Sequence, residues 1–179
     1  MSRPLTICAF TENTPGVLHR ITTLFTRRKV NIESLTVSET ERKGYSRFTI
    51  VIKEEPELAE KIARQIRRVI EVSKVYVAEN SELLFKEIAF YKVQAPSSQS
   101  RSAIEELAHR YHAEVVHTDE NHMFIEKTGS EDQISSLFRL LEPYGIAEFV
   151  RSGRIAIRTS DQSIEEKTIG SGTPTALDW

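Results

Sequence analysis

The residues best suited to chemistry lie in a short run near the N-terminus, residues 11–18, between an expected strand and an expected helix. Free backbone N–H groups at a helix start favour a carboxylate through hydrogen bonds and the helix dipole. Gly16 has no Cβ and lets a ligand approach the main chain, and the amide of Asn13 both donates and accepts hydrogen bonds. Val17 and Leu18 add apolar surface, so the run predicts a site for a small aliphatic zwitterion.

The same run also has an ordinary interpretation. A Pro-Gly pair, here Pro15 and Gly16, is common turn punctuation, and Asn13 or Thr14 could simply cap the helix that follows. From the residues by themselves, both the binding loop and the helix cap stay open.

Histidines suggest a different chemistry. His109 and His112 are three apart on an expected helix, and His117 and His122 flank an expected hairpin. Such a set could gather around zinc or nickel, yet imidazoles on turns and helix ends are commonly surface groups. A metal-sensing regulator, or a sensor of another amino acid, is therefore the alternative function, and no residue is assigned as a metal ligand.

Nothing in the chain predicts catalysis. It has no nucleophile–base pair, no P-loop and no GxGxxG fingerprint, so no catalytic residue is assigned. The basic stretch 64–68 interleaves with apolar positions, which fits the outer face of an amphipathic helix better than a nucleic-acid groove.

The amino-acid composition limits the kinds of partner that we expect the protein to bind. The 24 Lys and Arg residues nearly balance the 26 Asp and Glu residues, so the net charge of −2 gives no field that attracts nucleic acid or an anionic membrane. The one cysteine, Cys8, allows no disulfide and is expected to be a small buried hydrophobe. No uncharged apolar stretch approaches the roughly 18 residues that span a bilayer, so we expect a soluble, cytoplasmic protein.

The elements that must position the loop follow from hydrophobic periodicity. Strands are expected at 5–10, 32–38, 45–52 and 72–78. Apolar stripes predict two helices between them, carried by Val17, Leu18, Ile21, Leu24 and Phe25, and by Leu58, Ile62, Ile66, Val69 and Ile70. The order is therefore βαββαβ. Both faces of the first strand carry apolar groups, which suggests that a second copy buries the face without helices.

The pattern then repeats. Strands are expected at 87–94, 113–118, 122–127 and 146–150, with helical stripes at Ile104, Leu107, Ala108 and Tyr111, and at Ile134, Leu137, Phe138 and Leu141. The fold class is α+β, with two tandem ferredoxin-like βαββαβ domains at 1–80 and 81–159. Residues 160–179 are polar without an apolar period and predict a disordered tail.

Four runs resemble a known family. The runs 12–18 (Glu-Asn-Thr-Pro-Gly-Val-Leu), 31–37 (Asn-Ile-Glu-Ser-Leu-Thr-Val) and 46–50 are similar to the N-terminal ACT domain of acetolactate synthase small regulatory subunits. The run 150–157 is similar to the closing strand of that family's C-terminal domain, so the resemblance covers residues 3 to about 158. The Asn-x-x-Gly-x-Leu loop is shared by many amino-acid-binding relatives, whereas the 31–37 block is more specific.

The resemblance implies a homodimer whose ACT domains pair side by side. A branched-chain amino acid, valine above the others, would bind between residues Asn13, Thr14, Pro15, Gly16, Val17 and Leu18 of one chain and Asn31 and Ile32 of the other. Asn31 would close the pocket with a hydrogen bond and Ile32 would add an apolar wall, although Asn31 could instead end the helix in the left-handed region.

The implied function is regulation without catalysis. The partner would be the catalytic subunit, which carries thiamine diphosphate, Mg²⁺ and usually FAD, and this chain would bind none of these cofactors. The corresponding loop of the second repeat, residues 95–101, has no glycine and no Asn-x-x-Gly spacing, so no second effector site is expected there.

Overall fold

The computed structural model describes residues 2–160 of the chain, in two compact units. The first comprises residues 2–84 and 156–160, and the second residues 85–155. The predicted α+β class with two ferredoxin-like βαββαβ units is confirmed. Residues 161–179 of the predicted tail lie outside the described part. The boundary between the units falls inside the strand nearest that tail: Ile155 belongs to the second unit and residues 156–158 to the first.

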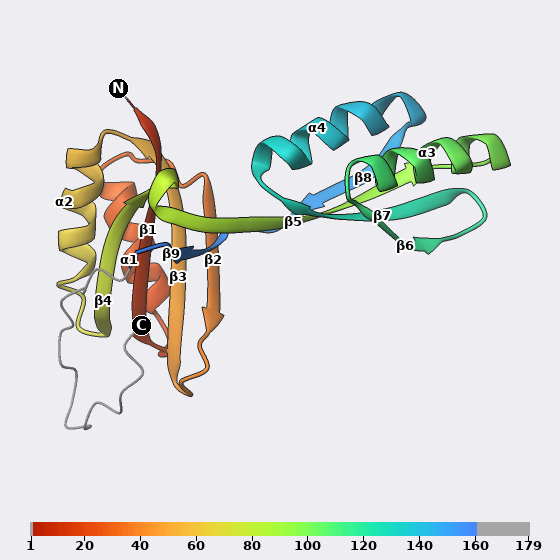
Figure 1. Cartoon of the computed structure of the whole chain (residues 1–179). Helices are drawn as coiled ribbons and strands as arrows, with labels where there is room; N and C mark the ends of the chain where they lie inside the picture. Colours follow the sequence, from red (N-terminus) through yellow and green to blue (C-terminus); the bar gives the residue numbers. More distant parts are fainter. Residues whose placement is uncertain (1, 161–179) are drawn as a thin grey trace. The chain divides into compact units, whose positions relative to one another are not determined.

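The first unit is one antiparallel sheet with two helices on one face (Figure 1). Its strands lie in the order β2-β3-β1-β4, with β2 and β4 at the edges. The bounds along the chain are β1 Arg3–Glu12, α1 Val17–Arg27, β2 Ser34–Glu39, β3 Tyr45–Glu54, α2 Pro56–Ile66 and β4 Val72–Glu79, followed by the 3₁₀ turn η1 Asn80–Glu82.

The apolar stripes predicted from the sequence make the core of this unit. Buried positions of the two helices meet alternate residues of β1 and β3, a set that includes Ile7, Ile21, Phe25, Ile50, Ile62 and Ile66. Two predicted members lie outside the core. Leu18 is 46% exposed, and Ile70 is 73% exposed because α2 ends at Ile66 and the turn that follows carries Ile70 away from the helical stripe.

The face of the sheet without helices is contacted by a short strand near the end of the described residues. Arg47 on β3 donates to the backbone carbonyl of Ala156 in β9 (Ile155–Arg158), and its guanidinium also reaches the Tyr76 hydroxyl at 3.2 Å. The Arg158 guanidinium lies 4.5 Å from the centre of the Tyr76 ring. Cys8, on the same face, is fully buried as predicted. Residues of β9 therefore contact the part of this face that carries Arg47 and Tyr76.

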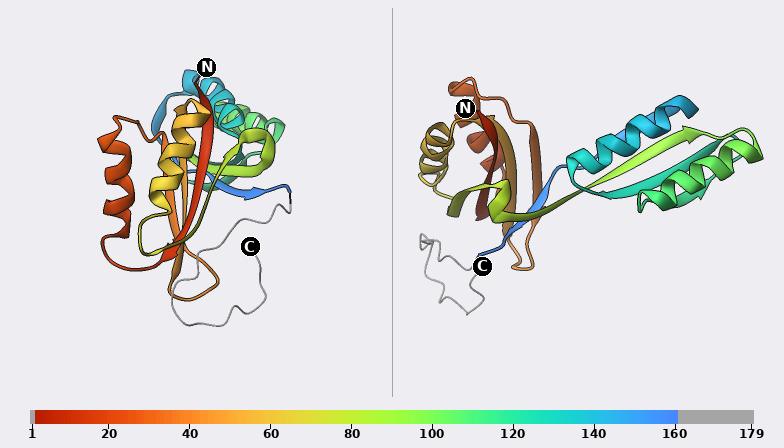
Figure 2. Two further views of the ribbon diagram at one scale, coloured as in Figure 1. Left: turned by 90° about the vertical axis from the view of Figure 1, so that its left-hand side faces the viewer. Right: turned by 45° about the horizontal axis from the view of Figure 1, so that its top comes forward.

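The second unit repeats the arrangement with the strand order β6-β7-β5-β8 and the short β9 paired with β5 (Figure 2). Its helices cover one face of its sheet. The bounds are β5 Leu83–Gln94, α3 Ser98–Arg110, β6 Glu114–Thr118, β7 His122–Gly129, α4 Glu131–Leu141, η2 Glu142–Tyr144 and β8 Ile146–Arg151. The five buried helical residues confirm the predicted stripes: Ile104, Ala108, Ile134, Leu137 and Leu141.

A buried tyrosine gives the second unit a testable pH dependence. The Tyr91 hydroxyl donates to the carbonyl of Ile134 at 2.8 Å, and burial raises the pKa of Tyr91 to about 12, against the opposing charge of Arg151. The neutral phenol is favoured in the folded state, so this stabilisation is present below pH about 10 and is lost as the pH rises toward 12.

We expect Tyr91→Phe to lower the free energy of unfolding at pH 7 by about 1–2 kcal/mol, because the Ile134 carbonyl loses its donor. The deficit relative to the native chain should shrink at pH 10.5 and above, as measured by urea unfolding followed by circular dichroism. Tyr111→Phe is the control, because the Tyr111 hydroxyl makes no hydrogen bond within residues 2–160, and it should change stability by less than about 0.5 kcal/mol. An equal deficit at both pH values would contradict the prediction.

Candidate functional site

The loop between β1 and α1 depends on a glycine in the left-handed region. Gly16 precedes the first helical residue with φ +88° and ψ −10°, a conformation that residues with a Cβ rarely adopt. No side chain caps the helix, so the interpretation of Asn13 or Thr14 as a cap is wrong. Instead, backbone hydrogen bonds fix the loop. The backbone N–H of Asn13 donates to the Gly44 carbonyl at 2.8 Å, and the backbone N–H of Thr14 donates to the Glu12 carbonyl at 3.0 Å.

The missing cap leaves donors free at the start of α1. Within residues 2–160, the backbone N–H groups of Leu18 and His19 have no hydrogen-bond partner, whereas the next amide, of Arg20, already donates to the Gly16 carbonyl at 3.0 Å. Unpaired first-turn amides and the positive end of the helix dipole favour an anion. The loop therefore has the chemistry to hold a carboxylate.

The predicted loop residues differ in how far they are exposed to solvent. Asn13, Thr14, Pro15 and Gly16 are exposed, and so is Leu18, whose side chain is 46% accessible. Val17 is 2% exposed and packs in the core, so its side chain does not add apolar surface beside the loop. Leu18 is the apolar group of the run that an aliphatic ligand could contact.

The second predicted segment lies at the other end of α1. Asn31 is exposed and its amide donates to the Glu33 carboxylate at 2.9 Å, while Ile32 packs partly against the core. The left-handed residue after α1 is Lys29, with φ +56°, so the suggestion that Asn31 ends the helix in that region is wrong. The eleven residues of α1 span about 16 Å at 1.5 Å per residue, so one small amino acid cannot touch both ends within one chain.

The corresponding loop of the second unit is closed. Ser97 caps α3, since its hydroxyl accepts from the backbone N–H of Ser100 at 3.1 Å and the Ser100 hydroxyl accepts from the backbone N–H of Ser97 at 3.2 Å. Arg101 fills the loop further by donating to the carbonyls of Ala95, Asp119 and Glu120 at 2.6–3.0 Å. The Ser100 amide, which corresponds to the free His19 amide of α1, is thus occupied at α3.

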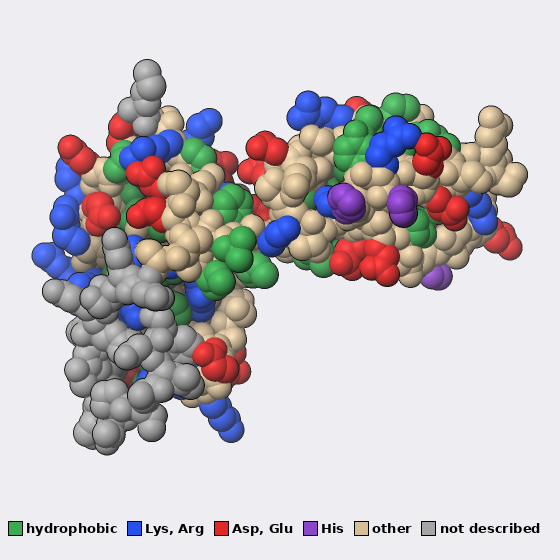
Figure 3. Space-filling view, viewed as in Figure 1, with side chains coloured by type: hydrophobic (Ala, Val, Ile, Leu, Met, Phe, Trp, Pro, Cys, Tyr) green, Lys and Arg blue, Asp and Glu red, His purple; other side chains and the backbone are tan. Residues whose placement is uncertain are grey.

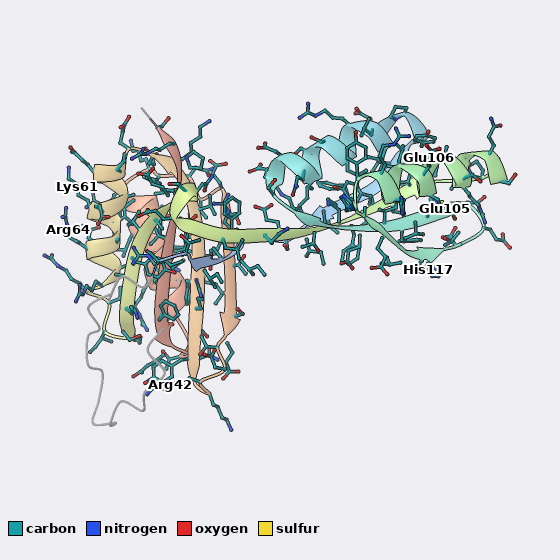
Figure 4. All side chains as sticks on the ribbon, viewed as in Figure 1. Arg42, Lys61, Arg64, Glu105, Glu106 and His117 are labelled. Carbon is teal, nitrogen blue, oxygen red and sulfur yellow. The ribbon has the colours of Figure 1, made fainter. Side chains whose placement is uncertain are left out.

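Two histidines of the second unit contact an aromatic ring and a carboxylate, respectively. The His117 ring lies 5.1 Å from the Phe124 ring on β6 and β7 (Figure 4), and His122 Nδ1 lies 3.3 Å from the Asp119 carboxylate. A backbone hydrogen bond from the Asn121 N–H group is the main cause that lowers the pKa of Asp119. Among the described residues, no three His, Cys, Asp or Glu side chains are placed to share a metal ion.

Charge is spread over the surface rather than gathered. Acidic and basic side chains alternate on the visible face of each unit (Figure 3), and Lys61 and Arg64 on α2 point away from the sheet (Figure 4). Ile66, in the same basic stretch, is fully buried, which confirms the outer face of an amphipathic helix. None of the helices within residues 2–160 has the length and apolar character to span a membrane.

An ion pair that the sequence did not suggest lies beside the loop. Arg20 on α1 pairs with Glu71, just before β4, and the Arg20 guanidinium nitrogen Nη1 would lie 3.5 Å from a Cβ built on Gly16. One signal in the sequence could have pointed to Arg20: it follows Gly16 by four residues, which on a helix places it one turn above the loop.

Two ferredoxin-like units, the first with an open glycine loop at a helix start, define a protein of the ACT type. Residues 7–74 match the family model described as the AHAS small subunit-like ACT domain, and residues 86–160 match the model of the small subunit of acetolactate synthase. The chain belongs to the family of acetolactate synthase small subunits.

Individual relatives agree with this assignment. The chain is 38% identical to the acetolactate synthase small subunit of Mycobacterium leprae over 89% of this chain and 94% of that protein. It is 40% identical to a probable small subunit of Archaeoglobus fulgidus, over 85% and 94% respectively. The crystal structure of the small subunit from Thermotoga maritima superposes with a TM-score of 0.81 at 27% identity, covering 89% of this chain and 99% of that one.

Proposed function

We propose that this chain is a non-catalytic regulatory subunit that raises the activity of the acetolactate synthase catalytic subunit and makes it sensitive to inhibition by a branched-chain amino acid, valine above the others. The observation that carries the effector site is the contrast between two equivalent helix starts. The α3 start is capped by its own serine, whereas the α1 start has free amides under a left-handed glycine.

The effector would bind between two copies of the chain. Because the Gly16 loop and Asn31 lie at opposite ends of α1, a helix about 16 Å long, a complete pocket needs the loop of one chain and Asn31 with Ile32 of another. Side-by-side pairing along the exposed edge strand β2 would supply this, since Val37 on that edge is 41% exposed. A homodimer through the ACT domains is therefore part of the proposal.

The catalytic chemistry would lie in the partner. Thiamine diphosphate, Mg²⁺ and FAD are expected in the catalytic subunit, which makes acetolactate or acetohydroxybutyrate in branched-chain amino acid biosynthesis, and not in this chain. We also propose that the complex works in the cytoplasm, without nucleic acid or membrane partners.

Reconstitution tests the proposal. By itself the purified chain should turn over no pyruvate, while the cognate catalytic subunit should gain activity when the chain is added and lose that gain when valine is added. Leucine and isoleucine are assayed in parallel, and light scattering should show a dimer at micromolar concentration. Unchanged activity on mixing two verified folded subunits would refute the regulatory role, and a strict monomer would refute the shared pocket.

A further inference from the structure

The strongest unexplained feature of the first unit is the ion pair between Arg20 and Glu71. Arg20 projects from the first turns of α1 with 46% of its side chain exposed, whereas the Glu71 side chain is 14% exposed. One Glu71 oxygen accepts from Arg20, and the other is buried without a hydrogen-bond partner within residues 2–160. The pair thus joins an accessible cation to a carboxylate that is only half satisfied.

The Arg20 guanidinium lies beside the glycine loop. The Arg20 guanidinium lies over the main chain of Gly16, with Nη1 3.5 Å from the point where a Cβ would be. The unpaired amides of Leu18 and His19 are in the same helical turn. An α-carboxylate held at those amides would lie within reach of a guanidinium, which binds carboxylates with two parallel donors.

The position of Glu71 connects the pair to the sheet. The Glu71 carbonyl accepts from the backbone N–H of Glu12 at 2.9 Å. Glu71, the residue before β4, is therefore hydrogen-bonded to the end of β1. Glu12 in turn accepts from the Thr14 amide at 3.0 Å. A change in what Glu71 pairs with is therefore transmitted directly to the base of the loop.

We propose that Arg20 binds the α-carboxylate of the effector and that Glu71 is the resting counter-ion which the effector displaces. This inference rests on the proposed amino-acid site and assigns two residues to it that the predicted site did not contain. Glu71 competes with the ligand carboxylate for the same guanidinium, so it lowers effector affinity, and only ligands with a carboxylate can displace it.

The two partners of the pair should therefore act in opposite directions. In titration calorimetry of the full chain with L-valine, Arg20→Gln should weaken binding by about tenfold or more, because a charge-assisted bond is lost. Glu71→Gln should strengthen it by about two- to fivefold, because the competitor loses its charge. Arg27→Gln, an exposed arginine on the last turn of the same helix, is the matched control and should bind as the native chain does.

The outcomes separate this inference from the proposed function. A merely structural ion pair would make both variants bind more weakly, which would overturn the proposal, as would native affinity in a folded Arg20→Gln. L-valinamide, which lacks the carboxylate, should bind the native chain far more weakly than L-valine, and Arg20→Gln should reduce that difference. If the native chain binds no branched-chain amino acid at all, the effector site itself is refuted and this inference with it.

Discussion

Replacement of Gly16 with aspartate is expected to abolish inhibition by valine while activation of the catalytic subunit persists. A carboxylate at position 16 would lie next to the ligand carboxylate, and two unit charges at about 4 Å cost about 1 kcal/mol in water and about 4 kcal/mol at an effective dielectric near 20. Its Cβ would also lie 3.5 Å from Arg20 Nη1, so the new side chain would neutralise the cation beside the loop. Affinity for valine should fall about tenfold or more.

Backbone strain adds to this effect and defines the control. At φ +88° any residue with a Cβ is strained by about 1–2 kcal/mol, which the folded unit should survive. Gly16→Asn carries the same strain without the charge, so it should keep more of the valine response than Gly16→Asp. Ser98→Asp, at the first residue of the capped α3, should leave inhibition intact. If Gly16→Asp folds and is still inhibited as the native chain is, valine does not bind at this loop.

A cavity in the core beneath the same helix should instead remove both activities. Phe25 is 1% exposed and packs among the buried residues of α1, α2 and the sheet. We expect Phe25→Ala to lower the free energy of unfolding by about 3–5 kcal/mol, a large part of the stability of a small domain. Activation and valine inhibition should then fall together as the first unit loses its fold.

Urea unfolding followed by circular dichroism measures that loss, with the reconstituted assay run at the same temperature. Thr26→Ala, one residue along on the exposed side of α1, is the control and should change stability by less than about 0.5 kcal/mol. A Phe25→Ala chain that is destabilised as expected but keeps both activities would show that the packing of α1 does not support regulation.

The sequence was sufficient for what local patterns encode. Stripes at helical spacing and alternating strands predicted the order of elements in both units, because each element must bury one face against the next. It also predicted the glycine loop. It did not predict that Gly16 itself precedes the helix in the left-handed region, since Pro-Gly pairs occur in several turn types.

What the sequence missed depends on contacts between distant residues. Residues 150–157 read as one closing strand, but the chain leaves β8 at Arg151 and forms the separate β9, whose Ala156 carbonyl accepts from Arg47, 109 positions earlier. Likewise, nothing near Arg20 in the sequence predicts that it pairs with Glu71, 51 residues away. Pairings of this kind are set by tertiary folding and leave no local period.

The return of β9 to the first unit has a consequence for the newborn chain. Residues 85–155 must leave the ribosome after the β1–β4 sheet has been made and before Ala156 can accept the Arg47 hydrogen bond. At roughly 5–20 residues per second, the sheet face that carries Arg47 and Tyr76 waits for several seconds without that strand. During this interval the face is available to chaperones, and an early stop of translation would leave it permanently uncovered by β9.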